Sequence, residues 1–254
     1  METLFIGKNI IFLPETDSTN SYATLLLKNV NLAEGTVIHT THQTQGKGQR
    51  GSSWNTDPAS NLTASIVLKP GFLDIKEQFF LYQIAALACY DTLSEILNNS
   101  HFDIKIKWPN DLLVNRQKIA GILIENNILN GRIVSSVIGV GINVNQAHFS
   151  KSMTATSLRL QLLNEKPFEV KDVLTRLCVH LEKHYLALKN GHHDEINANY
   201  LSHFFGLNSW MNFDAQGVQK ELFVKGITEN GLLQLEARNG SLQEADVKDV
   251  KWIY

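Results

Sequence analysis

The feature that most constrains the fold of this chain is a rigid corner at residues 107–111, which read Lys-Trp-Pro-Asn-Asp. Proline lacks a backbone N–H and is excluded from central strands, so Pro109 favours a turn. The apolar alternation at residues 104–108 predicts a strand that ends at this turn. The corner therefore places Asn110 and Asp111 at the mouth of a strand.

A second charged group follows the corner closely. Lys118 and Gly121 open the next apolar run, residues 119–125. An ammonium and a carboxylate presented at neighbouring strand ends suit a nucleotide phosphate and its magnesium. On this segment alone, a charged hairpin loop with one buried tryptophan is an equally good interpretation.

The bulk composition predicts an ordinary globular protein. The chain has 254 residues, 43% hydrophobic and 19% charged, with a net charge of −2. This charge gives no indication of a nucleic-acid or anionic-membrane surface. No apolar run approaches the roughly 20 residues of a membrane span, and no signal peptide is evident. Cys89 and Cys178 lie in apolar helical patterns, which favours buried thiols in a reducing compartment, so a cytoplasmic protein is expected.

Periodicity predicts alternating helices and strands over most of the chain. Helices are expected from the cap at Asp17 or Ser18, over residues 76–98 and over residues 170–188; strands are expected at residues 35–40, 61–68, 104–108, 119–125 and 132–144. From Gly206 the helical period disappears, and short apolar runs are separated by Asn-Gly pairs. We therefore expect two domains, residues 1–205 and a small β domain at residues 206–254.

A glycine-rich loop separates two of the expected strands. Residues 46–51 read Gly-Lys-Gly-Gln-Arg-Gly. Glycines let backbone N–H groups turn toward an anion, and Lys47 and Arg50 add positive charge. The spacing is not that of a Walker A loop. Trp54 at the end of the loop offers a flat face for an adenine ring or for a closing lid. Without Trp54, a flexible surface loop would be the better interpretation.

One predicted strand carries an unusual bare face. Ile138, Val140 and Ile142 point to one side, while Gly139 and Gly141 point to the other. Two glycines on one face weaken a strand unless something approaches the backbone closely. Either a flat ligand or another element of the protein can fill that space.

Two further groups of polar residues invite a functional interpretation. Residues 18–20, Ser-Thr-Asn, stand at a helix start; an N-cap explains one of them, and a small neutral polar ligand would use all three. His180 and His184 are four apart, but Leu181 stands where a zinc protease motif has Glu, so a solvated helix face is expected. The pair at residues 192–193 is expected in a loop, and no histidine metal site is predicted.

Five segments occur in one order and together resemble the biotin protein ligases, also called biotin–[acetyl-CoA-carboxylase] ligases. The matching segments are residues 15–20, 43–54, 107–111, 118–122 and 139–143. The resemblance covers a catalytic domain from about residue 12 to about residue 188. It implies an α/β (α+β) fold, with a mixed-sheet, class II synthetase-like catalytic domain and a small C-terminal SH3-like β-barrel.

The resemblance also implies a two-step reaction. Biotin and ATP, with Mg²⁺, give biotinyl-5′-AMP, and the biotinyl group then passes to a lysine of a biotin carboxyl carrier domain of a biotin-dependent carboxylase. Lys118, Asp111 and Arg50 are the implied catalytic residues, and Asp111 is the implied magnesium ligand. The implied biotin-binding residues are Ser18, Thr19, Asn20, Gln43, Gly46, Lys47, Gly48, Gln49, Lys118, Gly121, Gly139 and Gly141. The implied ATP-binding residues are Lys47, Arg50, Trp54, Asn110, Asp111, Lys118 and Asn143.

The glycine loop departs from the family pattern. Lys47, Gln49 and Ser52 occupy positions that are usually arginine, so two cations are missing beside the phosphates. No helix-turn-helix segment precedes the first motif, so a ligase without DNA binding is expected, and a homodimer is compatible with the sequence. The alternatives are a lipoate ligase or octanoyl transferase of the same fold, and a binding module that holds a small ligand without chemistry.

Overall fold

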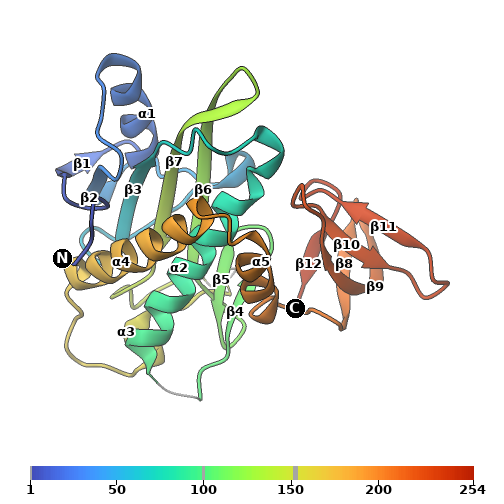
Figure 1. Ribbon diagram of the computed structural model, residues 1–254. Helices are drawn as coiled ribbons and strands as arrows, with labels where there is room; N and C mark the ends of the chain where they lie inside the picture. The colour runs from blue at the N-terminus through green and yellow to red at the C-terminus, as the bar shows by residue number, and fades with distance from the viewer. Residues whose placement is uncertain (1, 99–100, 151–153) are drawn as a thin grey trace.

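A mixed sheet of seven strands forms the centre of the larger part of the molecule (Figure 1). The computed structural model describes residues 2–98, 101–150 and 154–254, except the side chain of Arg50. The strands are β1 (Ile10–Thr16), β2 (Val37–Gln43), β3 (Leu62–Leu68), β4 (Ile104–Lys107), β5 (Asp111–Val114), β6 (Gln117–Leu129) and β7 (Arg132–Ile142). Their order is β1-β2-β3-β7-β6-β5-β4, and only β1 and β2 pair in parallel.

Helices cover the two faces of this sheet unequally. Helix α1 (Thr19–Asn29) packs through Ala23 with Val67 and Val137 on one face. The opposite face lies under α2 (Phe79–Leu97) and α4 (Val170–Lys189), and α5 (His193–Ser202) packs beside them. Short helical turns occur at η1 (Gln49–Gly51), η2 (Ile75–Glu77) and α3 (Leu158–Gln161). One sheet face is thus filled by a thick helical layer, while much of the other stays free for a site.

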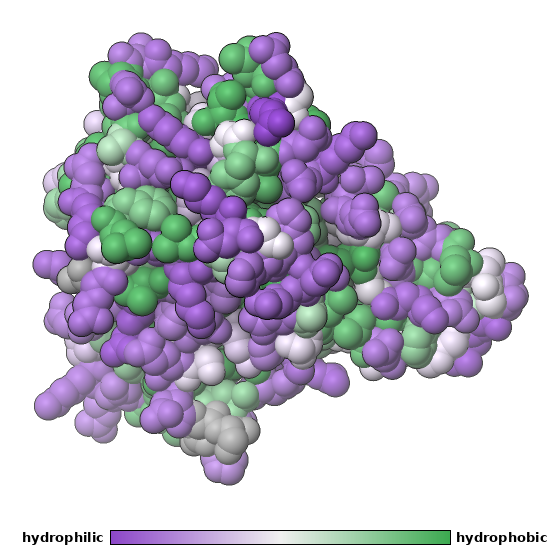
Figure 2. Space-filling view, viewed as in Figure 1, coloured by the Kyte–Doolittle hydropathy of each residue, from purple (hydrophilic) through white to green (hydrophobic). Residues whose placement is uncertain are grey.

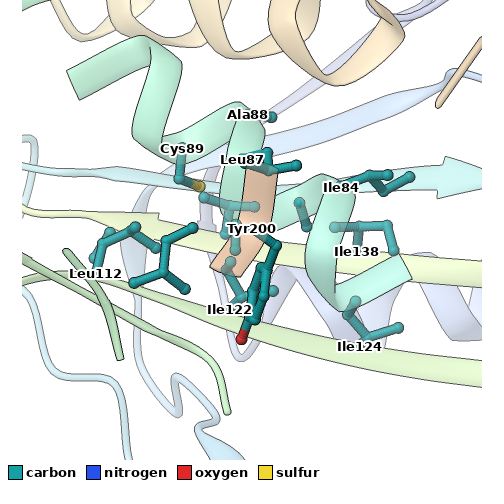
Figure 3. Close-up of a cluster of buried hydrophobic side chains, with 14 of the residues drawn as sticks. Ile84, Leu87, Ala88, Cys89, Leu112, Ile122, Ile124, Ile138 and Tyr200 are labelled. Carbon is teal, nitrogen blue, oxygen red and sulfur yellow. The ribbon is translucent and has the colours of Figure 1, made fainter. Parts of the chain in front are cut away.

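Strand alternation explains the main hydrophobic core. Residues 138, 140 and 142 of β7 point into it, as the sequence predicts. Figure 3 shows Ile84 and Leu87 of α2 beside Ile122, Ile124 and Ile138 of the strands. Burial of this apolar surface is the main term that holds α2 against the sheet. Because side chains alternate along a strand, the intervening residues of β6 and β7 point to the opposite face of the sheet, on which α1 packs.

The C-terminal residues form a separate antiparallel sheet of five strands. They are β8 (Trp210–Ala215), β9 (Val218–Ile227), β10 (Leu233–Glu236), β11 (Leu242–Ala245) and β12 (Lys251–Ile253), in the order β11-β10-β9-β8-β12. Its apolar face joins the main core through residues such as Phe213 and Trp252. The predicted mixed-sheet fold class is confirmed together with this C-terminal sheet; the boundary at residue 206 stays a prediction.

Several elements were not expected from the sequence, among them β1, β5, α3 and α5. Strand β1 is an edge strand that alternates only weakly and contains Pro14, so its pattern resembles a loop. Helix α5 begins at His193, where a loop was predicted, and this prediction is wrong. Only Ile196 and Tyr200 of α5 are buried, which is too sparse an apolar stripe to predict a helix.

The remaining bulk predictions can be compared with the structure directly. Cys89 and Cys178 are both free and buried, as predicted, and burial raises the pKa of each thiol to about 12. On the face seen in Figure 2, hydrophilic side chains predominate and hydrophobic ones form small separate groups. In the part of the chain that the structure describes, no helix has the length and apolar character that crossing a membrane requires.

Candidate active site

Most of the predicted site residues meet around one cavity of about 530 Å³. The start of α1, the loop before β3, strands β3, β6 and β7, the corner between β4 and β5, and β12 all line it. The predicted residues in the lining are Ser18, Thr19, Asn20, Gln43, Lys47, Gly48, Gln49, Trp54, Asn110, Asp111, Lys118, Gly121, Gly139 and Gly141. The fold therefore brings together segments that are more than 100 positions apart in the sequence.

The corner at residues 108–110 is tied down on both sides. Trp108 is 2% exposed, and its Nε1 donates to the carbonyl of Gly231 at 2.8 Å. Trp252 Nε1 donates to the carbonyl of Trp108 at 3.1 Å. Asn110 Nδ2 donates to the carbonyl of Ile122 at 2.8 Å, and the Ile122 N–H returns a bond of 2.9 Å to Asn110. The C-terminal sheet thus helps to fix the corner that carries the charged residues.

Three charged residues form one end of the cavity, which we call the lysine end: Lys107, Asp111 and Lys118. Asp111 Oδ1 lies 2.6 Å from Lys118 Nζ, and Oδ2 lies 3.1 Å from Lys107 Nζ. The Asp111 side chain is 13% exposed, against 34% for Lys118. One carboxylate between two ammonium groups leaves a net positive charge, held in place before any ligand arrives. Such an arrangement favours a developing negative charge.

The glycine floor of the cavity is covered by a tryptophan. Gly121 and Gly141 are cross-strand neighbours on β6 and β7. The Trp54 indole lies over both, because a Cβ on Gly141 would collide with it and a Cβ on Gly121 would lie 3.1 Å from its Cζ3. Trp54 Nε1 is buried without a described hydrogen-bond partner. Lys118 Nζ lies 5.5 Å from the ring centroid. The Trp54 side chain therefore packs on the face that the glycines leave bare, and it lines the cavity there.

The opposite end of the cavity is neutral, and we call it the amide end: Ser18, Thr19, Asn20 and Gln43. Ser18 caps α1 by accepting a 3.5 Å hydrogen bond from the N–H of residue 21. The backbone N–H and the hydroxyl of Thr19 both donate to Gln43 Oε1, at 2.8 and 3.1 Å. The prediction that an N-cap accounts for only one of residues 18–20 is confirmed.

The glycine loop is folded into a compact hairpin. Gly48 N–H donates to the carbonyl of Ser52 at 2.7 Å, and Trp54 N–H donates to that of Gly46 at 2.9 Å. The Gln49 side chain and Tyr82 of α2 line a second cavity together. Burial raises the pKa of Tyr82, and the Gln49 side chain partly offsets this effect. The neutral residue in an arginine position thus lies beside the helical layer.

Two predicted residues lie outside the cavity lining, and the side chain of a third is not described. Asn143 is buried, and its Nδ2 donates to the carbonyl of Thr156 at 3.0 Å, so it does not line the expected adenine side. Gly46 also lies outside the lining, and a Cβ there would collide with the carbonyl of Trp54. Arg50 has its backbone in η1, but its side chain lies outside the described part, so its predicted role stays a prediction.

The sequence analysis missed several residues of the site. Thr63 lines the cavity, and Ser65 and Glu125 hydrogen-bond to Asn20 at the amide end. Alternation along β3 and β6 could have indicated these positions, because they share a face with the glycines. Lys251 and Tyr254, at the C-terminal end of the chain, also line the cavity. No local sequence pattern predicts that these two residues reach it.

The histidine pair on α4 is not a solvated face, so that prediction is wrong. His184 Nε2 lies 2.8 Å from Asp91 Oδ2, and His180 Nε2 lies 3.0 Å from Glu95 Oε2. These pairs join α4 to α2, and the His184 side chain is only 8% exposed. Among the described residues, no set of three or more His, Cys, Asp or Glu side chains could hold a metal ion.

Comparison with known proteins gives consistent relatives. The bifunctional ligase/repressor BirA of Bacillus spizizenii is 28% identical over 98% of this chain and 76% of its own length. The biotin–[acetyl-CoA-carboxylase] ligase of Paracoccus denitrificans is 36% identical over 52% of this chain and 53% of its own length. This chain therefore matches one named ligase over nearly its whole length and another over about half of it.

A solved structure and a family model complete the comparison. The Aquifex aeolicus biotin protein ligase in complex with biotin and ATP has a TM-score of 0.77 and 24% identity, covering 96% of this chain and 98% of that one. At this identity, the likeness shows the fold alone. The model of the biotin/lipoate A/B protein ligase family matches residues 12–143, which is more than half of the chain. The chain belongs to the biotin/lipoate A/B protein ligase family.

Proposed function

We propose that this protein is an ATP-dependent biotin–protein ligase that works in two steps. A carboxylate oxygen of biotin attacks the α-phosphorus of ATP, so that the P–O bond to pyrophosphate breaks and biotinyl-5′-AMP forms. The amine of a carrier lysine then attacks the acyl carbon, AMP leaves, and the amine loses a proton. The names of the relatives and their bound biotin and ATP support this proposal.

The observation that carries the proposal is the lysine end. Two ammonium groups held on a single carboxylate give a fixed positive site in the lining of the cavity. When the biotin carboxylate meets the α-phosphate, two anions must approach each other, and charge grows on the phosphoryl oxygens. Lys118 can bridge both groups, since it is the most exposed of the three residues. A binding module without chemistry has no need for this arrangement.

The charges around the cavity also suit a polyphosphate. Four lysines line it in the described structure, Lys47, Lys107, Lys118 and Lys251, while Asp111 is its sole acidic residue there. Electropositive walls attract ATP and lower the cost of bringing its phosphates out of water. Lys47 belongs to the glycine loop and Lys251 to β12. We assign the nucleotide to the space between them.

Magnesium is a separate question, because ATP enters such enzymes with this ion. Magnesium is usually held by one or two carboxylates, several waters and the phosphates. Asp111 is the one carboxylate that lines the described cavity, and both its oxygens already face ammonium groups. These residues do not form a protein-built magnesium site, so no step is assigned to the metal. Asp111 as a ligand stays a prediction, as do the carrier domain, a homodimer and a cytoplasmic location.

Exchange of labelled pyrophosphate into ATP tests the first step. We expect exchange that depends on biotin and is not supported by lipoate or octanoate. Biotin binding without exchange would favour the binding module, and exchange with lipoate would favour the related ligase. Transfer to a purified biotin carboxyl carrier domain, followed by mass spectrometry, tests the second step; a carrier that gains no biotinyl group would contradict it.

A further inference from the structure

Asn20 lies on the sheet where one strand has no side chain. Ser65 of β3, Gly139 of β7 and Leu123 of β6 are cross-strand neighbours in one row. A Cβ on Gly139 would collide with the Asn20 amide, so the glycine makes room for that side chain. Asn20 is 3% exposed and lines the cavity. Its amide is therefore held in one place, and its orientation decides what the cavity receives.

The partners of Asn20 determine that orientation. Its Nδ2 donates to Glu125 Oε2 at 2.8 Å and to the carbonyl of Leu123 at 3.3 Å. An ionised carboxylate and a carbonyl can only accept, so this atom must be the nitrogen. The Ser65 hydroxyl lies 2.6 Å from Oδ1. Both N–H groups are therefore used inside the protein, and Asn20 offers the cavity an acceptor only.

Gln43 has the complementary orientation. Its Oε1 accepts from both the N–H and the hydroxyl of Thr19, and a backbone N–H can only donate. The Gln43 Nε2 group has no described acceptor and is left with its donors. The amide end thus presents one acceptor and one donor group to the same cavity. A cyclic urea, with N–H groups beside a carbonyl, matches this pattern.

We infer that Glu125 is a positioning residue that selects for the ureido ring by locking the Asn20 amide with its oxygen toward the ligand. This inference rests on the proposed function. Glu125 does not line the cavity, and it acts only through Asn20. A site built to hydrogen-bond a ligand N–H rejects analogues that lack it, because its own buried group is then unpaired.

The Glu125→Gln variant tests the lock with little change of shape. A glutamine amide can donate as well as accept, so the Asn20 orientation is then fixed only by the longer 3.3 Å bond to the Leu123 carbonyl. An Asn20 amide that turns over presents N–H groups, which repel a ureido N–H. We expect the KM for biotin in pyrophosphate exchange to rise about tenfold, with kcat and the KM for ATP within twofold of the parent. Glu165→Gln, at an exposed loop position, is the matched control and should change nothing.

A double variant and two analogues separate positioning from general stability. In Asn20→Asp with Glu125→Gln, residue 20 is again an acceptor and residue 125 donates to it, so we expect the biotin KM to recover to within about threefold. The parent should discriminate against one of the two N-methylbiotin isomers, and Glu125→Gln should lose most of that preference. An unchanged biotin KM and unchanged preference would overturn the inference, as would a lower melting temperature with no rescue. If the parent shows no biotin-dependent exchange, the proposed function fails instead.

Discussion

The two ends of the cavity differ in the kind of side chain that forms them, charged at one end and neutral at the other. The lysine end consists of three charged side chains on the β4–β5–β6 hairpins, with ion pairs of 2.6 and 3.1 Å that remain partly open to water. The amide end consists of neutral groups from α1 and β2, and Thr19 and Asn20 are almost fully buried. Charged groups held in place by ion pairs suit a reaction in which charge develops, whereas buried amides suit recognition. We therefore expect changes at the first end to act mainly on kcat, and changes at the second end to act mainly on the KM for biotin.

The Lys118→Ala variant should give the largest effect. It removes the ammonium group nearest to the expected meeting point of carboxylate and phosphate, and it leaves Asp111 with one partner. Loss of one such contact typically costs a hundredfold or more in kcat, or about 3 kcal/mol. Pyrophosphate exchange and direct measurement of biotinyl-AMP check this. Lys105→Ala is the matched control, since Lys105 faces Asp103 at 3.8 Å outside the cavity. A variant that makes adenylate within a few-fold of the parent would refute the assignment.

The sequence predicted the lysine end better than the floor between the two ends. Residues 107–111 are contiguous, and Pro109 fixes their direction, so a local motif was enough to place Asp111. The bare glycine face was also correctly predicted, but the sequence left open whether a ligand or another part of the protein fills it. Trp54 and Asn20 cover Gly141 and Gly139 through tertiary contacts between distant segments. No local pattern encodes such contacts.

The Gly141→Val variant tests whether the floor belongs to the biotin slot. The new side chain would collide with the Trp54 indole, so Trp54 must move into the cavity or away from it. Overpacking of this kind costs about 1–3 kcal/mol. We expect biotin affinity to fall at least tenfold, with a lower but cooperative melting transition. Gly71→Val, where a Cβ meets open space, is the control. Unchanged affinity in isothermal titration would separate the floor from biotin binding.

The Gln43→Glu variant tests the amide end without emptying it. The carboxylate can still accept both hydrogen bonds from Thr19, but the donor group on the cavity side is lost. Leaving a ligand carbonyl opposite a carboxylate oxygen should raise the KM for biotin about tenfold. The kcat should change by less than threefold if the two ends act separately. Gln45→Glu, at an exposed neighbour outside the cavity lining, is the control. A fall in kcat as large as that of Lys118→Ala would contradict the assignment of catalysis to the lysine end and of recognition to the amide end.

The smallest effects are expected in the loop of residues 46–54, which lies beside both ends. Closure over a mixed anhydride would shield it from water. We expect trypsin to cut this loop quickly in the free protein and slowly once biotin and ATP are present. Equal rates in both states would contradict a lid.

Gln49 gives the loop a neighbour that an arginine pattern would not have suggested, since it lines a second cavity together with Tyr82. If a hydrogen bond between these two side chains holds the loop over the adenylate, Tyr82→Phe should increase the release of biotinyl-AMP about threefold, because a neutral hydrogen bond contributes about 0.5–1.5 kcal/mol. Gln49→Arg gives up the same bond but adds a cation beside the phosphates, so it should slow the release if charge matters more. Release is measured by trapping free adenylate in the absence of the carrier. The two variants therefore show whether the hydrogen bond or the charge matters more for retaining the adenylate. If both variants increase the release of biotinyl-AMP, the hydrogen bond of Gln49 keeps the loop closed. If only Gln49→Arg alters the release, the absence of an arginine at position 49 limits how well the loop retains biotinyl-AMP.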